Sequence, residues 1–169
     1  PTGAVSLAPS PINLTDHLVI SEVQVAGAKA EDEFIEIYNP TATLISLSNY
    51  SIQYLSGRAT STDRILKRNF PEASEIPAGR FFLLVNNGAT SSWVSRADLT
   101  YSSFSLSGER TGGILFLASS TSMVQDINDL NIADRVAFGE VALAGISTSS
   151  APATNQSLER KANSENCAA

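Results

Sequence analysis

The chain has 169 residues, 43% of them hydrophobic and 17% charged, so it can bury one sizeable core and is not a disordered tail. Its net charge of −6 and its pI near 4.7 argue against a nucleic-acid-binding protein, because affinity for a polyanion comes mainly from Lys and Arg. The single cysteine, Cys167, permits no internal disulfide and no cysteine-based metal site, and no apolar run is long enough to span a bilayer.

The chain begins with a segment that has no apolar periodicity. Residues 1–14 combine prolines with Ser, Ala and Gly, which is typical of a linker. Residues 15–163 are expected to form one domain, followed by a tail at 164–169. The first strand is predicted over His17–Val25, with Val19, Val23 and Val25 on one face.

The stretch from Asp32 to Leu55 has the clearest strand pattern. In its first half Ile35 and Ile37 share one face of an extended segment and can face a core. Asn39-Pro40 ends that strand, because proline cannot donate to a strand ladder. A second strand follows after a short turn, with Tyr50, Ile52 and Tyr54 on one face and Ser51 and Gln53 on the other. The two strands are expected to form one sheet fragment.

Further short strands are separated by turn residues along the rest of the chain. They are expected at Arg64–Phe70, Phe81–Val85, Tyr101–Leu106, Ile114–Leu117, Met123–Ile127, Asp134–Phe138 and Ser157–Lys161. One short helix is expected over Ser91–Asp98, around Trp93. Closely spaced short strands with almost no helical period predict an all-β sandwich of about eight to ten strands.

Six motifs in this order resemble the lamin tail domain, an immunoglobulin-like β-sandwich found in nuclear lamins and in many secreted bacterial and archaeal proteins. They are Ile20-Ser21-Glu22-Val23, Glu33-Phe34-Ile35-Glu36-Ile37-Tyr38-Asn39, Leu47-Ser48-Asn49-Tyr50-Ser51-Ile52, Ile76-Pro77-Ala78-Gly79, Asp134-Arg135-Val136-Ala137-Phe138-Gly139 and Ser157-Leu158-Glu159-Arg160-Lys161. The resemblance covers the chain from about Val19 onward, and the opening and closing motifs fit the prokaryotic branch better than the lamins.

The resemblance implies a domain without catalytic residues. We therefore expect a binding or scaffold module, monomeric within a larger exported or cell-surface prokaryotic protein, with a protein or cell-surface glycan as its partner. An alternative is an accessory domain that positions a secreted nuclease or phosphoesterase on its substrate. Glu36 and Asp134 occupy characteristic motif positions, and we interpret both as structural polar residues at strand edges.

Two acidic clusters could supply oxygen ligands for calcium. Asp126, Asn128 and Asp129 form the better candidate, because closely spaced Asp and Asn side chains in a turn offer several oxygens. Short Asp/Asn turns also form for hydrogen-bonding reasons alone. If calcium does bind, the domain would be a calcium-dependent surface adhesion module. The weaker candidate is the run Glu31, Asp32 and Glu33.

Three other features could carry function, and each has a simpler structural interpretation. His17 follows Asp16, but no nucleophile motif accompanies the pair, so we interpret His17 as an exposed residue at the start of a strand. Trp93 could be a platform for sugar rings, but we expect it to pack against the sandwich, and Phe81 and Phe82 to lie in the core. Four basic residues lie close together in the sequence and could contact an anion or an acidic glycan. The simpler interpretation is that they belong to a solvated sheet edge. They are Arg58, Arg64, Lys67 and Arg68.

Overall fold

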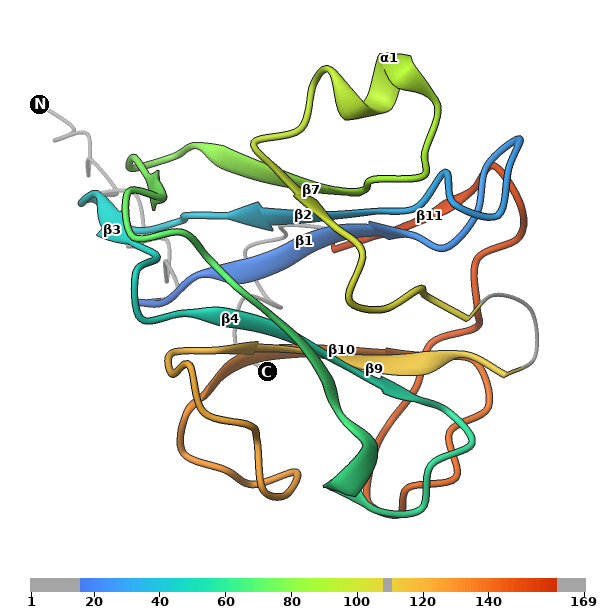
Figure 1. Cartoon of the computed structure of the whole chain (residues 1–169). Helices are drawn as coiled ribbons and strands as arrows, with labels where there is room; N and C mark the ends of the chain where they lie inside the picture. Colours follow the sequence, from blue (N-terminus) through green and yellow to red (C-terminus); the bar gives the residue numbers. More distant parts are fainter. Residues whose placement is uncertain (1–15, 108–110, 161–169) are drawn as a thin grey trace, which may run out of the picture.

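The protein is a sandwich of two β-sheets, seen in a computed structural model that describes residues 16–107 and 111–160. Figure 1 shows the two sheets lying face to face, with the single α-helix above the upper one. The predicted lead-in at 1–14, the tail at 164–169 and Cys167 lie outside the described residues. The all-β sandwich predicted from the sequence is confirmed.

One sheet has five strands and the other has four. The first has the order β11 (Ser157–Glu159), β1 (Val19–Gln24), β2 (Phe34–Tyr38), β7 (Phe81–Asn86) and β8 (Leu99–Tyr101). The second has the order β10 (Ile132–Phe138), β9 (Gly113–Ala118), β4 (Ser51–Ser56) and β5 (Leu66–Asn69). A small separate sheet joins β3 (Ile45–Ser46) to β6 (Glu75–Ile76), and the short helices are η1 (Thr62–Arg64) and α1 (Ser91–Val94). Neighbouring strands are antiparallel, except for β7 and β8.

The main core lies between the two sheets, as the alternation in β2 predicts. Ile35 and Ile37 are fully buried and point toward the facing sheet, where β4 and β9 contribute Ile52, Leu115 and Leu117. Each such side chain stabilises the fold by about 1.5–3 kcal/mol through the apolar surface it removes from water.

A second core lies on the outer face of the four-stranded sheet. Loops cover this face and enclose a cluster of apolar residues, Leu55, Ile65, Ile114, Phe116, Ala118, Val124 and Ala137. Ser51 and Gln53 are therefore fully buried, although the alternation placed them on the open side of β4. The Ser51 hydroxyl donates to the Ser120 carbonyl at 2.6 Å, and the Gln53 amide donates to the Ser122 carbonyl at 2.7 Å. Strand β4 is thus buried on both faces.

Two predicted strands are wrong: Met123–Ile127 is a loop, and of Tyr101–Leu106 only Tyr101 lies in a strand. Residues 123–127 form a loop over β4, because Val124 N–H donates to the Gln53 side chain at 2.9 Å instead of to another strand. Strand β8 ends at Tyr101, and the chain then crosses toward the interior, where Phe104 and Leu106 are buried.

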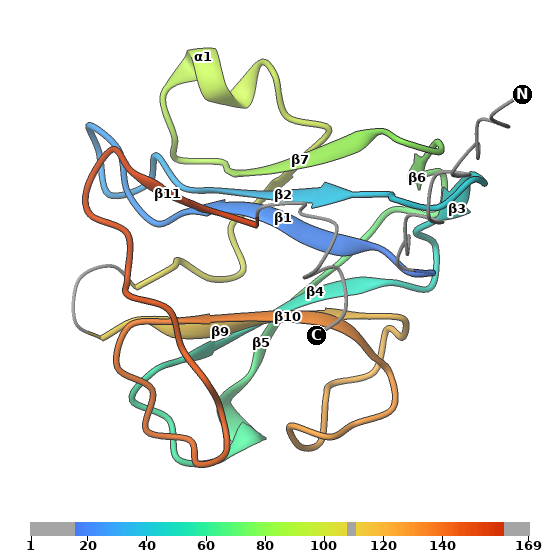
Figure 2. The same ribbon diagram turned by 180° about the vertical axis from the view of Figure 1, so that it is seen from behind.

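Strands β2 and β4 do not form the single sheet fragment that the sequence suggested. They belong to opposite sheets and contribute to the core from its two sides. Figure 2 shows the same separation from behind, with β2 in the upper layer and β4 in the lower.

The first strand also differs from the prediction on one point. A β-bulge lies between Ile20 and Glu22, so the alternation shifts by one residue at Ser21. Val23 then lies in the main core, whereas Val19 falls on the outer face of the five-stranded sheet beside Tyr38.

Candidate binding surface

The outer face of the five-stranded sheet is covered over only part of its area. Figure 1 shows α1 above one half of β7 and, among the described residues, no helix or strand above the other half. Under α1, Phe34 stacks on Trp93 with ring centroids 5.1 Å apart, and Val85 and Ala89 are buried with it. Trp93 is therefore packed against the sandwich, as expected, and is not a free platform.

The uncovered half presents an aromatic pair. Tyr38 in β2 lies directly opposite Phe81 in β7, and their ring centroids are 4.6 Å apart. The Phe81 residue is 56% exposed, so the prediction that it belongs to the core is wrong. The reason is alternation: Phe82 takes the inward position and is 7% exposed, which leaves Phe81 pointing outward.

Beside the aromatic pair, three glutamates stand in register across three adjacent strands. Glu22 in β1 lies opposite Glu159 in β11 on one side and opposite Glu36 in β2 on the other. The Ser21 hydroxyl donates to the Glu36 carboxylate at 2.7 Å. Within residues 16–107 and 111–160, none of the three carboxylates lies in an ion pair. Like charges directly opposite on a sheet destabilise it, so this row costs folding energy.

Asp134 joins the two sheets at the side where β10 faces β1. Its carboxylate accepts from Ile20 N–H at 2.7 Å and from the Arg160 guanidinium at 2.9 and 3.0 Å. Arg160 also donates to the Ile20 carbonyl at 3.2 Å. Burial raises the pKa of Asp134, and the Arg160 charge opposes that rise. The two family-motif residues therefore hold the bulged strand β1 against β10.

Arg160→Ala is expected to destabilise the domain by about 1–3 kcal/mol. Losing one partner of a buried pair costs about 3–5 kcal/mol, but the Arg160 side chain is 35% exposed, and water would partly solvate Asp134. Urea unfolding measures the effect, and Arg96→Ala, at an exposed arginine just after α1, is the matched surface control. In an Asp134→Asn background the same Arg160 change should cost less than about 1 kcal/mol. Equal costs in both backgrounds would contradict the pairing.

Glu33 is the second buried carboxyl group, although it begins a family motif and follows two other acidic residues in the sequence. It is 1% exposed and accepts from Leu106 N–H at 2.6 Å and from the Asn86 amide. Burial raises its pKa to about 7, against the opposing hydrogen bonds from Asn86 and Leu106. The Tyr101 hydroxyl beside it is buried and has no hydrogen-bond partner with good geometry among the described residues.

The rest of that acidic run does not converge with Glu33 on a metal site. Asp32 points to backbone instead, with carboxylate oxygens that accept from Thr90 N–H at 2.7 Å and Lys29 N–H at 2.9 Å. The first of these bonds lowers the Asp32 pKa most. Glu31 is exposed at the surface. Asp32 and Glu33 therefore fix two loops to the sheet.

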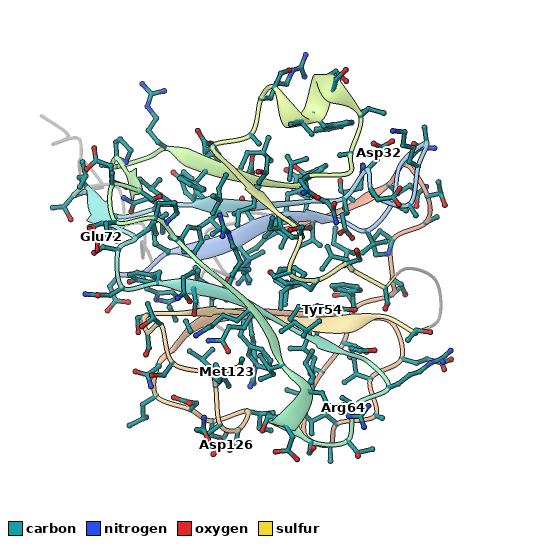
Figure 3. The ribbon with its side chains drawn as sticks, viewed as in Figure 1. Asp32, Tyr54, Arg64, Glu72, Met123 and Asp126 are labelled. Atoms are coloured by element: carbon teal, nitrogen blue, oxygen red, sulfur yellow. The ribbon has the colours of Figure 1, made fainter. Side chains whose placement is uncertain are left out.

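The predicted calcium ligands lie together in one turn. Asp126 accepts from Asn128 N–H at 2.7 Å, while the two oxygens of Asp129 accept from Gln125 N–H and Asn131 N–H, each at 2.9 Å. The bond from the Asn131 backbone is the main cause that lowers the Asp129 pKa. Figure 3 shows Asp126 at the far end of the loops below the four-stranded sheet. Over the described part of the chain, no group of three His, Cys, Asp or Glu side chains could hold a metal ion.

A thermal melt in EDTA and then in millimolar calcium tests the calcium hypothesis. We expect an unchanged melting temperature, because backbone N–H groups already occupy the Asp129 carboxylate. A ligand that binds only the folded state raises the melting temperature by mass action. A rise that disappears in Asp126→Asn would contradict our expectation and assign the metal to this turn.

The remaining candidates are His17 and the four basic residues. His17 contacts Asp16 at 3.0 Å on the exposed surface. Lys67 donates to the Thr121 carbonyl, which fixes the loop over β4, and Arg64 ends η1. Arg58 lines a cavity of about 920 Å³ with Thr111, Glu140 and the loop at 148–154. Arg58 and Arg64 also line one small cavity together, and Lys67 and Arg68 are neighbours on β5, so the four basic residues form two separate pairs.

Comparison with known proteins gives one clear match. The family model for the lamin tail domain matches residues 13–139, which is most of the chain. No curated protein matches the sequence. Across the described residues, no helix has the length and apolar character needed to cross a membrane. The matched segment contains strands β1 to β10, including Glu36 and Asp134 at the positions that the motifs identified. The chain therefore belongs to the lamin tail domain family, whose members are immunoglobulin-like domains without catalytic function.

Proposed function

We propose that this domain is a binding module of an exported or cell-surface prokaryotic protein, with a protein or surface glycan as its partner. The observation that carries the proposal is the contrast between buried and exposed polar groups. The buried carboxylates of Asp32, Glu33 and Asp134 are bonded to the backbone of the fold itself. The outer face of the five-stranded sheet instead exposes Phe81 and carries a row of half-buried or exposed carboxylates that cost stability.

That contrast favours binding over a purely structural role. Like charges directly opposite on neighbouring strands destabilise a sheet, and aromatic side chains on a surface are common anchors in protein interfaces. The face is also part of a rigid, hydrogen-bonded sheet, so a partner would meet a surface that is already in place.

The experiment is a binding assay on the organism that produces the protein. The whole chain, labelled with a fluorophore, is added to intact cells, and bound label is measured against concentration. We expect saturable binding that unlabelled domain displaces. Linear uptake without displacement would contradict a binding role on that surface. Phosphodiester and phosphomonoester hydrolysis are measured in parallel, and activity that His17→Ala removes would contradict the non-catalytic role.

The second candidate is an accessory domain that positions a secreted nuclease or phosphoesterase. The same assay separates the two, since such a domain should instead bind the substrate of a catalytic domain encoded in the same gene. Raised KM without a change in kcat, after the domain is deleted from the full-length enzyme, would favour this candidate.

A further inference from the structure

We propose that the uncovered half of the five-stranded sheet docks a basic protein segment, with an apolar side chain against the Tyr38–Phe81 pair and Lys or Arg side chains against the glutamate row. The inference rests on the proposed binding function and adds the surface and the chemistry of the partner. We call this area the docking face and define it by Tyr38, Phe81, Glu22, Glu36 and Glu159.

Strand register places the apolar and acidic parts of the docking face side by side. Val19, Tyr38 and Phe81 form one cross-strand row on β1, β2 and β7. Glu36, two residues before Tyr38 in β2, lies in the next cross-strand row with Glu22 and Glu159. Successive residues on one face of a strand are about 7 Å apart, so a segment of a few residues can touch both rows.

The aromatic pair offers a site for an apolar or cationic side chain. Phe81 is 56% exposed and is held by its contact with Tyr38, so its ring has little freedom to lose on binding. Aromatic side chains on a rigid face are common anchors in protein interfaces. Aromatic faces also attract Arg and Lys cations.

The glutamate row determines the sign of the charge that we expect on the partner. Three aligned carboxylates without an ion-pair partner in the described residues produce a negative potential, and a basic segment would relieve their mutual repulsion. The Ser21 hydroxyl holds one oxygen of Glu36 in place, which fixes this carboxylate beside the aromatic row. Two arginines adjoin the docking face in sequence: Arg80 is exposed just before β7, and Arg160 follows Glu159 but directs its guanidinium to Asp134 and the Ile20 carbonyl.

The test uses blocked synthetic peptides and the whole isotope-labelled chain. The first peptide carries one tryptophan flanked by arginines. In the second peptide citrulline, which has nearly the same shape without the charge, replaces each arginine. In the third peptide alanine replaces the tryptophan. Titrations followed by amide NMR shifts should perturb β1, β2 and β7 around the docking face. Both altered peptides should bind at least about fivefold more weakly than the first, because each lacks one of the two contacts.

Matched variants of the domain localise the binding. Phe81→Ser should weaken the first peptide about tenfold, and Glu22→Gln with Glu159→Gln about fivefold. The controls are Leu130→Ser, at a fully exposed apolar residue, and Asp126→Asn with Glu140→Gln, at exposed acidic residues in the loops that follow β9 and β10 of the other sheet. Neither control should change the affinity by more than twofold, and circular dichroism melts verify that every variant is folded.

Three outcomes would overturn the docking face. The first is that the acidic control pair weakens binding of the first peptide as much as Glu22→Gln with Glu159→Gln does, which would mean unspecific charge attraction. The second is that the peptide perturbs NMR shifts outside β1, β2 and β7. The third is that no peptide binds at millimolar concentration. The cell assay separates this failure from failure of the proposed function. If wild type and Phe81→Ser bind cells equally, the module binds through another surface; if neither binds cells, the proposed function fails whatever the peptides show.

Discussion

Ile37→Asp should abolish cooperative folding. Ile37 is fully buried between Ile20 in β1 and Phe82 in β7, its neighbours across the two adjoining strands. The substitution removes about 1.5–3 kcal/mol of apolar burial and places a carboxylate where no cation faces it, at a further cost of several kcal/mol. A domain of this size has about 5–15 kcal/mol of stability, so the sum removes most or all of it. Circular dichroism melts measure the outcome.

Two controls separate the buried position from the substitution itself. Ile37→Val keeps the site apolar and should cost about 0.5–1.5 kcal/mol. Leu130→Asp introduces the same charge at a fully exposed residue and should stay within about 0.5 kcal/mol of wild type. A cooperative melt of Ile37→Asp near the wild-type temperature would disprove the inward orientation of β2.

The second large effect is a loss of stability as the pH rises through neutrality. The pKa of Glu33 is raised from 4.5 to about 7 in the folded protein, mainly by burial. Between these values the folded state holds a proton that the unfolded state has lost, so stability falls as the pH increases. The full contribution is present below about pH 4.5 and is lost above about pH 7, and a shift of this size corresponds to about 3 kcal/mol. Urea unfolding at pH 5 and pH 8 measures the difference.

Glu33→Gln should flatten this pH profile, because the side chain no longer titrates. Its absolute stability can differ from wild type, since the amide rearranges the bonds to Asn86 and Leu106, so the slope is the quantity to compare. Glu31→Gln, two residues away and exposed, leaves Glu33 in place and should keep the wild-type slope. Asp134, whose pKa is also raised by burial, adds a loss of the same sign in both proteins. A Glu33→Gln variant with the wild-type slope would rule out Glu33 as the cause.

The fold could be predicted from local patterns because most strands alternate clearly and are bounded by turn residues. The alternation of Ile35 and Ile37 identified the core face of β2 correctly. The sequence motifs also identified the family, and the family model confirms it over residues 13–139.

Features that depend on distant parts of the chain could not be predicted in this way. The burial of Ser51 and Gln53 is caused by a loop about seventy residues away, with bonds to the carbonyls of Ser120 and Ser122. A bulge is not visible in residue types alone, so Val19 was assigned to the wrong face. Glu33 looked like one member of an acidic run, although the fold buries it beside Leu106.

The docking face could not be predicted from the sequence for a related reason. Glu22, Glu36 and Glu159 are far apart along the chain, and only the strand order β11-β1-β2 places them in one row. Phe81 and Phe82 are identical residue types, and only the pairing of β7 with β2 determines which one points outward. The residue types alone therefore do not show which side chains share this face, because strand order and register determine it.

The unequal covering of the two sheets has a consequence for how the family can diversify. Strands β4 and β9 are enclosed on both faces, so nearly every position in them is constrained by packing. On β1, β2 and β7, several outward positions of one half, such as Glu22, Glu36 and Phe81, are partly or largely exposed and are less constrained by packing. Mutations there can alter recognition while the enclosed sheet preserves the architecture. A lineage could therefore acquire a new binding specificity through a handful of substitutions on one face, without passing through unstable ancestors.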